Sequence, residues 1–205
     1  MNQLMQYIET VPELAPQNGS RKFTGAVAAE YDKKREQSPK WIIEQQIIEG
    51  MLSDLPKDTL VLDCPIGTGR FMQFYTDHGF IVLGMDISEA MLVEASKKVD
   101  KERARGEFRV GNILDTKLAD KSVDVAVNVR VTRWLMGDHG PDGIRQMLAE
   151  MQRVARNRIV LTARVDHHKF AVTLDLVQSA LDGWAITQNV AGVDLDYRIL
   201  MLEPV

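Results

Sequence analysis

Short apolar runs alternate with helical patterns along most of this chain, and this alternation restricts the possible folds more than any other feature. Each run has the length of a buried strand and is too short for a helix. The five runs are residues 59–63, 80–86, 107–112, 123–129 and 157–165. The helical segments between and after them include residues 88–99, 142–154 and 168–181. Strands that alternate with helices predict a doubly wound α/β sheet in which most strands are parallel.

The C-terminal residues extend this pattern with two more strands. Residues 184–191 and 196–203 are largely apolar and are separated only by a short loop that contains Gly192. Such a short connection favours an antiparallel pair, because parallel strands need a longer crossover. We therefore expect a mostly parallel seven-stranded sheet with an antiparallel C-terminal strand pair.

The N-terminal quarter is helical instead of alternating. One helical pattern covers residues 24–37, and a second begins at Ser38-Pro39, with the serine as expected N-cap and the proline in the first turn. We expect residues 24–55 to form N-terminal cap helices within a single domain, 24–205. The mixed, proline-containing residues 1–23 are expected to form an N-terminal arm.

The composition narrows the function classes. A net charge of −4 and a pI near 5.6 disfavour nucleic acid as a partner, because its phosphate backbone needs a basic surface. No apolar stretch approaches the ~20 residues of a membrane helix, and the N-terminus has no secretory signal pattern. Cys64 is the only cysteine, so no disulfide can form within the chain. We expect a cytoplasmic protein without a membrane partner, and a homo-oligomer stays open.

Residues 61–71, VLDCPIGTGRF, connect the first strand to the first helix of the sheet. Ligands of doubly wound sheets bind at the carboxyl ends of the strands. Gly67 and Gly69 allow a tight turn and a close approach to a ligand, and the helix that follows favours an anion. A dinucleotide fingerprint has a small residue three places after its second glycine, where this chain has Met72. A dinucleotide-dependent oxidoreductase is therefore disfavoured.

Two acidic residues end the first two strands. Asp63 precedes the glycine turn, where its carboxylate can accept from a cationic amine, or from loop N–H groups in a purely structural role. Asp86 ends the second strand, roughly 20 residues after the turn, where this architecture places the acid that accepts from ribose hydroxyls. The alternative for Asp86 is a helix-start carboxylate, although Ser88 already provides a cap.

These motifs resemble those of the class I S-adenosylmethionine-dependent methyltransferases, over most of the chain from about residue 25. VLDCPIGTGRF resembles the first motif of the family and GMDISEAML its second-strand element. GNILD, SVDVAVNVRVTRWL and MLAEMQRVARNRIVLTARV resemble the third, fourth and fifth elements in order. The resemblance implies a Rossmann-like fold, S-adenosylmethionine as cofactor, and methyl transfer by in-line displacement.

The resemblance also implies roles for individual residues. Asp63, Gly67 and Gly69 would line the methionine end of the cofactor, and Asp86 would bind its ribose. Further contacts with the cofactor are expected from residues in or beside the same motifs, namely Cys64, Pro65, Thr68, Arg70, Ile87, Asn128 and Arg130.

The residues expected at the adenine end of the cofactor match the family motifs less closely. Asn112 and Ile113 would flank the adenine, although the family often has an acid at the first of these positions. An asparagine still offers an acceptor oxygen. Met91 would pack on the adenine face, or else fill the core, as methionines at helical spacing often do. Cys64 is not expected to be a nucleophile, because no base lies beside it in the sequence.

Candidate acid–base residues follow the fourth and fifth strands. His139 lies in a glycine-rich turn, and His167 follows the fifth strand beside Asp166 and His168. His139 and His167 are the candidate catalytic bases for an acceptor that must lose a proton, and solvated loop histidines are the alternative. We expect no metal site, because adjacent histidines seldom face one ion and no other His/Cys cluster accompanies them.

Aromatic and cationic side chains are the candidates for a substrate site and a lid. Tyr31, Arg35 and Trp41 of the cap would face the ligand pocket, as the corresponding segment does in many small-molecule methyltransferases of this class. Arg133 and Trp134, which follow the fourth strand, would join them. The alternatives are a cap that packs on the sheet edge, and a surface cation beside a packing residue.

No motif identifies the acceptor. The segment from Asn128 to Val131 lacks the proline pair and the following aromatic of amino-methylating DNA enzymes. Together with the acidic pI, this favours a small-molecule acceptor. One alternative is a protein or RNA acceptor that a partner subunit recognises. Another is a non-catalytic nucleoside-binding sensor or structural subunit.

Overall fold

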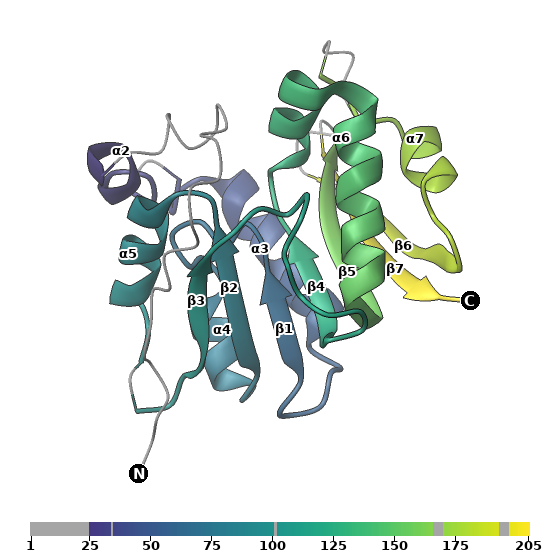
Figure 1. Ribbon diagram of the computed structural model, residues 1–205. Helices are drawn as coiled ribbons and strands as arrows, with labels where there is room; N and C mark the ends of the chain where they lie inside the picture. The colour runs from purple at the N-terminus through teal and green to yellow at the C-terminus, as the bar shows by residue number, and fades with distance from the viewer. Residues whose placement is uncertain (1–24, 34, 101, 166–169, 193–196) are drawn as a thin grey trace.

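A computed structural model describes residues 25–33, 35–100, 102–165, 170–192 and 197–205 (Figure 1). The strands are β1 (Leu60–Asp63), β2 (Ile81–Asp86), β3 (Arg105–Val110), β4 (Val123–Asn128), β5 (Ala155–Arg164), β6 (Trp184–Ala191) and β7 (Tyr197–Pro204). The helices are α2 (Gly25–Ala29), α3 (Pro39–Leu52), α4 (Met72–Asp77), α5 (Glu89–Lys97), α6 (Thr132–Val154) and α7 (Leu174–Ser179).

The strands form one seven-stranded sheet in the order β3-β2-β1-β4-β5-β7-β6. Neighbouring strands from β3 through β5 pair in parallel, and β7 runs antiparallel to β5 and to β6. This confirms the predicted doubly wound sheet and its antiparallel C-terminal pair. The chain winds outward from β1 to β3 and then returns to β4 on the other side of β1. The direction of winding therefore switches between β1 and β4, where ligands of such sheets bind.

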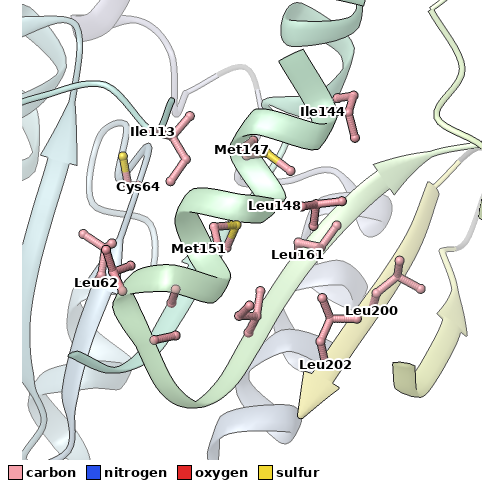
Figure 2. Packing of buried hydrophobic residues seen from close by; sticks show 14 of the residues in the cluster. Leu62, Cys64, Ile113, Ile144, Met147, Leu148, Met151, Leu161, Leu200 and Leu202 are labelled. Carbon is pink, nitrogen blue, oxygen red and sulfur yellow. The ribbon is translucent and has the colours of Figure 1, made fainter. Parts of the chain in front are cut away.

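The sheet is covered on both faces, so its alternate side chains enter two separate hydrophobic cores. Leu62 belongs to the core under α6 and α7, whereas its neighbour Val61 belongs to the core under α3, α4 and α5. Figure 1 shows α6 in front of the sheet and α3 and α4 behind it. In Figure 2 the α6 side chains Met147 and Leu148 pack toward Leu161 of β5. Burial on both faces explains why the strands are continuous apolar runs in the sequence.

The N-terminal helices are partly as predicted. The expected helix over residues 24–37 is wrong in extent, because α2 ends at Ala29 and turns follow it. In those turns the Asp32 carbonyl accepts from Arg35 N–H at 2.7 Å, while the Asp32 carboxylate accepts from Thr68 Oγ1 at 2.7 Å. This contact joins the segment to the loop after β1. Helix α3 begins at Pro39 as predicted, but Ser38 makes no side-chain capping bond. The predicted arm, 1–23, lies outside the described residues.

Helix α6 starts earlier than its sequence indicates. The pattern predicts a helix from residue 142, whereas α6 begins at Thr132 and has a non-helical break at Gly140, with φ of 62°. The glycine-rich turn is therefore a kink between two helical pieces. Helix α7 is shorter than the predicted 168–181, since the helix cap is Thr173, whose hydroxyl accepts from Leu176 N–H. None of the described helices is both long and apolar enough to cross a bilayer.

Candidate functional site

A cavity lies at the carboxyl ends of β1, β2 and β4, beside the point where the winding direction switches. Its floor comes from Asp63 and Asp86, at the ends of two adjacent strands. The loop after β1 and the start of α5 form one side, with Pro65, Ile66, Gly67, Thr68, Arg70, Phe71, Ile87 and Met91. The cap and the segment after β4 form the other side, with Tyr31, Trp41, Val129, Arg130, Val131, Trp134, Leu135 and Asp138.

The glycine loop takes a backbone path that side chains rarely adopt. Gly67 has φ of 57° and Gly69 has φ of 73°, both in the left-handed region that favours glycine. A Cβ on Gly69 would lie 3.0 Å from Met72 Cγ, so the loop packs tightly on its own helix. A Cβ on Gly67 would meet no protein atom within 4 Å. Because Gly67 lines the cavity, the protein leaves space there for a ligand to approach the backbone.

Two buried carboxyl groups form the floor of the cavity. The Asp86 carboxylate accepts from Gly67 N–H at 2.9 Å and from Ser88 N–H at 2.9 Å. Burial raises the pKa of Asp86 to about 6, against the lowering effect of these bonds. Asp63 accepts from the Tyr75 hydroxyl at 3.0 Å, and burial raises its pKa to about 7. Neither carboxyl group forms an ion pair within the described part of the chain, and the Arg70 charge only partly offsets the effect of burial on Asp63, so the floor favours a cationic ligand. We call this part, at the ends of β1 and β2, the acidic half.

Not every residue expected at the cofactor lines the cavity. The Cys64 side chain points into the core shared with Leu62 and Ile113, and its burial raises the pKa of its thiol (Figure 2). Asn128 is fully buried and donates its amide to the Cys64 carbonyl at 2.8 Å. The side-chain oxygen of Asn112 accepts from Leu114 N–H at 3.0 Å, so that acceptor is used inside its own turn. Gly69 shapes the loop from behind the cavity wall.

A buried carboxylate that the sequence motifs did not reveal joins the cap to the cavity. Glu44 of α3 is 3% exposed and accepts from Arg70 Nη1 at 2.7 Å and from Arg130 Nε at 2.8 Å. The Arg70 guanidinium lies 3.6 Å from the centre of the Trp41 ring. Helical spacing could have indicated this residue, because Glu44 lies three places after Trp41 and four before Ile48, which are both buried.

The other side of the cavity is aromatic and cationic. Tyr31, Trp41 and Trp134 line it together with Arg130, whose guanidinium lies 4.9 Å from the centre of the Tyr197 ring. We call this part, formed by the cap and the segment after β4, the basic half. Two of the three predicted cap residues, Tyr31 and Trp41, thus line the cavity.

Several candidates for the substrate site lie away from the cavity wall. The Arg35 guanidinium stacks on the Tyr31 ring, 3.7 Å from the ring centre. The Arg133 guanidinium lies 5.4 Å from the centre of the Trp134 ring. His139 is exposed and does not line the cavity. His167, with Asp166 and His168, lies outside the described residues. Within the described ranges, no group of three His, Cys, Asp or Glu side chains is arranged to hold a metal ion.

Comparisons with known proteins agree with this fold. Residues 61–158 match the model of a family described as a methyltransferase domain. A malonyl-[acyl-carrier protein] O-methyltransferase from Hamiltonella defensa is 32% identical over 107 residues, which is 52% of this chain and 37% of that protein. A second protein of that name, from Pectobacterium atrosepticum, is 29% identical over 47% of this chain and 34% of its own length. The aligned part of this chain thus spans about a third of each of these curated relatives.

Solved structures extend the likeness to nearly the whole chain. Magnesium protoporphyrin IX methyltransferase from Synechocystis PCC 6803, solved with bound S-adenosylhomocysteine, has a TM-score of 0.75 at 15% identity, over 91% of this chain and 98% of that one. The N-methyltransferase NodS from Bradyrhizobium japonicum, in complex with S-adenosylhomocysteine, has a TM-score of 0.70 at 14% identity, over 83% and 90%.

The sheet order defines a Rossmann-like fold, with the glycine loop and the two strand-end acids at its ligand edge. Residues 61–158, just under half of the chain, are similar to the methyltransferase-domain family, and the fold is shared with S-adenosylmethionine-dependent methyltransferases. The methyl donor of this class is S-adenosylmethionine, whose sulfonium and ammonium groups suit a floor of buried carboxylates.

Proposed function

We propose that this protein transfers the methyl group of S-adenosylmethionine to a small-molecule acceptor bound in the basic half of the cavity. The observation that carries this proposal is the pair of buried carboxyl groups, Asp63 and Asp86, beside an open glycine loop. Burying two such groups without a cation costs stability, so the site is arranged for a ligand that brings positive charge.

Individual residues suit parts of the cofactor. Asp86 has acceptor capacity beyond its bonds from backbone N–H groups and would accept from the ribose hydroxyls. Asp63 and the Gly67 backbone would hold the methionine end. Ile87 and Met91 give an apolar wall beside Asp86, suited to the adenine. Asn112 and Ile113, which do not line the cavity themselves, would flank the adenine on the far side of this wall. Cys64 and Asn128 would act by fixing the loop, since the Asn128 amide bonds to the Cys64 carbonyl.

The protein's contribution to the reaction would be alignment and exclusion of water. The acceptor atom attacks the methyl carbon, and the C–S bond breaks with its electron pair on sulfur, which leaves a neutral thioether. Correct placement of two reactants can contribute ~7–11 kcal/mol. The cap would act as a lid, because Glu44 and Trp41 of α3 contact Arg70 of the glycine loop directly. His139 and His167 remain candidate bases for an acceptor that must lose a proton.

A small acceptor fits the enclosed aromatic walls and the acidic composition of the chain. The names of the relatives and neighbours cover O- and N-methyltransferases, and an acyl carrier and a porphyrin, so they support small or carrier-borne acceptors without selecting one. A protein or RNA acceptor brought by a partner subunit, and a nucleoside sensor without turnover, are the alternatives.

Calorimetry and a radiolabelled-methyl screen test the proposal. S-adenosylmethionine and S-adenosylhomocysteine should bind, and NAD should not. Purified protein with labelled S-adenosylmethionine should then transfer label to members of a small-metabolite pool. NAD binding tighter than both nucleosides would contradict the cofactor assignment. Tight nucleoside binding with no labelled product from metabolite, protein or RNA pools would favour the sensor.

A further inference from the structure

The cavity has opposite charges at its two ends. Asp63 and Asp86 lie under the acidic half, at the ends of β1 and β2. Arg130 lies in the basic half, after β4, and the guanidinium of Arg164 at the end of β5 lies 5.9 Å from the same Tyr197 ring that Arg130 contacts. Along the carboxyl edge of the sheet, the charged side chains that line the cavity are thus acidic at β2 and β1 and include the Arg130 cation after β4.

Glu44, Arg70 and Arg130 form a buried ion cluster next to the basic half, and this cluster has one more positive charge than negative charges. The Glu44 carboxylate is shared by two guanidinium groups, those of Arg70 and Arg130. One carboxylate neutralises one of these cations, so the cluster keeps a net charge of about +1. An uncompensated charge in a partly buried place is costly, and a bound anion would remove that cost.

The two arginines are not equivalent in this cluster. All three nitrogens of Arg70 are used, by Glu44, by Gln45 and by the Trp41 carbonyl, and its side chain is 7% exposed. Arg130 donates to Glu44 through Nε only, and its side chain is 29% exposed. Among the contacts of the described residues, its two terminal amino groups have no carboxylate or carbonyl partner. The excess charge is therefore presented by Arg130.

The structure holds Arg130 in a defined and unusual conformation. Its φ is 61°, in the left-handed region that side chains other than glycine rarely adopt. Its N–H donates to the buried Thr162 hydroxyl at 2.7 Å, which fixes the backbone. The guanidinium lies 5.6 Å from the Trp41 ring and 4.9 Å from the Tyr197 ring. Strain of this kind persists where the surroundings enforce it, and it clusters at ligand sites.

We propose that Arg130, aimed by Glu44, binds a carboxylate in the cavity, and that the methyl acceptor supplies this carboxylate. The inference rests on the proposed methyl transfer, because it assigns the basic half to the acceptor. A guanidinium that keeps two terminal amino groups free matches the two oxygens of a carboxylate. Asp138 also lines this half, but it is exposed and has an interaction of its own.

The cofactor carries a carboxylate too, at its methionine end, and is the competing source. Asp63 suits the cofactor's cationic groups, and Asp86 at the end of the neighbouring strand suits its ribose. Arg130 lies on the opposite side of β1, in the direction of β5 and β7, beside the Trp41 and Tyr197 rings. The guanidinium is thus on the side of the cavity assigned to the acceptor, and the matched ligand pairs below separate the two sources.

The test measures two matched ligand pairs on four proteins: wild type, Arg130→Gln, Arg130→Lys and Arg145→Gln. Arg145 is an exposed arginine of α6, paired with Asp142 on the surface, and it controls for loss of one positive charge. The first pair is S-adenosylhomocysteine and methylthioadenosine, which share the nucleoside and differ in the amino acid. The second pair is benzoate and benzamide, titrated by ligand-observed NMR into protein saturated with S-adenosylhomocysteine. Melting temperatures of all four proteins verify folding.

Wild type should prefer benzoate over benzamide by about ten-fold or more, as expected for bonds between charged groups. Arg130→Gln should lose this preference, Arg130→Lys should keep part of it, and Arg145→Gln should keep all of it. The ratio of S-adenosylhomocysteine to methylthioadenosine affinity should stay unchanged in all variants.

Two results would overturn the proposal in different ways. If Arg130→Gln weakens S-adenosylhomocysteine at least ten-fold and leaves methylthioadenosine unchanged, the cofactor supplies the carboxylate and the acceptor assignment is wrong. If no preference depends on Arg130 in the folded variants, the site does not bind a carboxylate. Failure of wild type to bind either nucleoside would instead remove the proposed function. In that case the benzoate pair, titrated without nucleoside, still reports on Arg130.

Discussion

The two halves of the cavity are built in different ways. The acidic half comes from one stretch of chain, between Asp63 and Met91. The N–H groups of Gly67 and Ser88 fix the Asp86 carboxylate, and the Tyr75 hydroxyl donates to Asp63. The basic half brings together Trp41 of the cap and Arg130 after β4, held by an ion pair between residues 86 positions apart, and Arg130 also contacts the Tyr197 ring of β7. The acidic half is therefore fixed by the sheet, whereas the basic half depends on docking of the cap.

This difference suits the binding of the cofactor by one half and of the acceptor by the other. A cofactor shared by a whole class of enzymes needs the same local geometry each time, and a short loop between two strands provides it. An acceptor differs from one enzyme to another, and side chains from several elements can change without altering the sheet. The following predictions test whether the two halves are separate in stability, in binding and in response to pH.

The largest effect is expected for Glu44→Ala, which should lower the free energy of unfolding by about 3 kcal/mol. The substitution leaves Arg70, which is 7% exposed, with its cation and no carboxylate, and breaking a buried pair in this way is strongly destabilising. Urea unfolding measures the loss. Glu49→Ala on the same helix is the matched control, because Glu49 is only partly buried and accepts from Gln45. An equal loss for both variants would mean that Glu44 does not hold the cap.

Asp86→Ala should act on the other half and weaken S-adenosylhomocysteine by ~30–150-fold, or roughly 2–3 kcal/mol. The carboxylate can accept from the ligand as well as from Gly67 and Ser88 N–H. Asp86→Asn should be milder, because the amide retains one acceptor oxygen. Calorimetry and melting are measured on all three proteins. A variant that melts far below wild type, yet binds the nucleoside normally when folded, would make Asp86 a structural residue only.

Asp63→Asn should stabilise the ligand-free protein by about 2 kcal/mol at pH 8 and by less at pH 5. Burial raises the pKa of Asp63 to about 7, so the folded state favours the protonated form. The stabilising contribution of that form is present at low pH and is lost as the pH rises from about 4 through 7. Asparagine mimics the protonated form at every pH. Thermal melting from pH 4 to pH 8 measures the difference, and Asp142→Asn on the surface should shift little.

The same pKa values predict the pH dependence of cofactor binding in wild type, with the opposite sign. A cationic cofactor needs the ionised carboxylates, so affinity should fall as the pH drops through about 7 for Asp63 and about 6 for Asp86. Asp63→Asn should bind more weakly at pH 8 and should show a flatter profile. Wild-type affinity for S-adenosylmethionine that stays constant from pH 8 to pH 5.5 would contradict the ionic role of the floor.

How far the sequence predicted each half follows from the way each half is built. Asp63, Gly67 and Asp86 were predicted at the ligand edge because strand ends and a glycine turn are local patterns. Glu44 was not predicted, because no sequence motif indicates a carboxylate whose partners, Arg70 and Arg130, are 26 and 86 residues away. Arg70 was expected at the cofactor, but the docked cap engages all its nitrogens. Contacts of this kind follow from tertiary packing, which periodicity does not encode.

Helix boundaries show the same limit at smaller scale. Glycine and proline near residue 140 predicted a turn before the helix, and the turn exists as a kink at Gly140. The preceding residues are nevertheless helical, because Leu135 belongs to the core under α6 and ties that turn to the sheet. This extra helical piece is what places Trp134 on the cavity wall and leaves His139 outside it.

The smallest effect is expected for His139→Ala, which should change kcat by less than about two-fold for a carboxylate acceptor. A carboxylate attacks the methyl group without losing a proton, so such a reaction needs no base. His139 is also exposed and lies outside the cavity wall, in a position that transfers no proton from a bound acceptor without a rearrangement of α6. Initial rates across pH 6 to 9 for wild type and variant check this. If the variant loses ten-fold or more at pH 8, a histidine base acts on an acceptor that carries a proton. The reacting atom would then be a protonated group of the acceptor, not the carboxylate that Arg130 is proposed to bind.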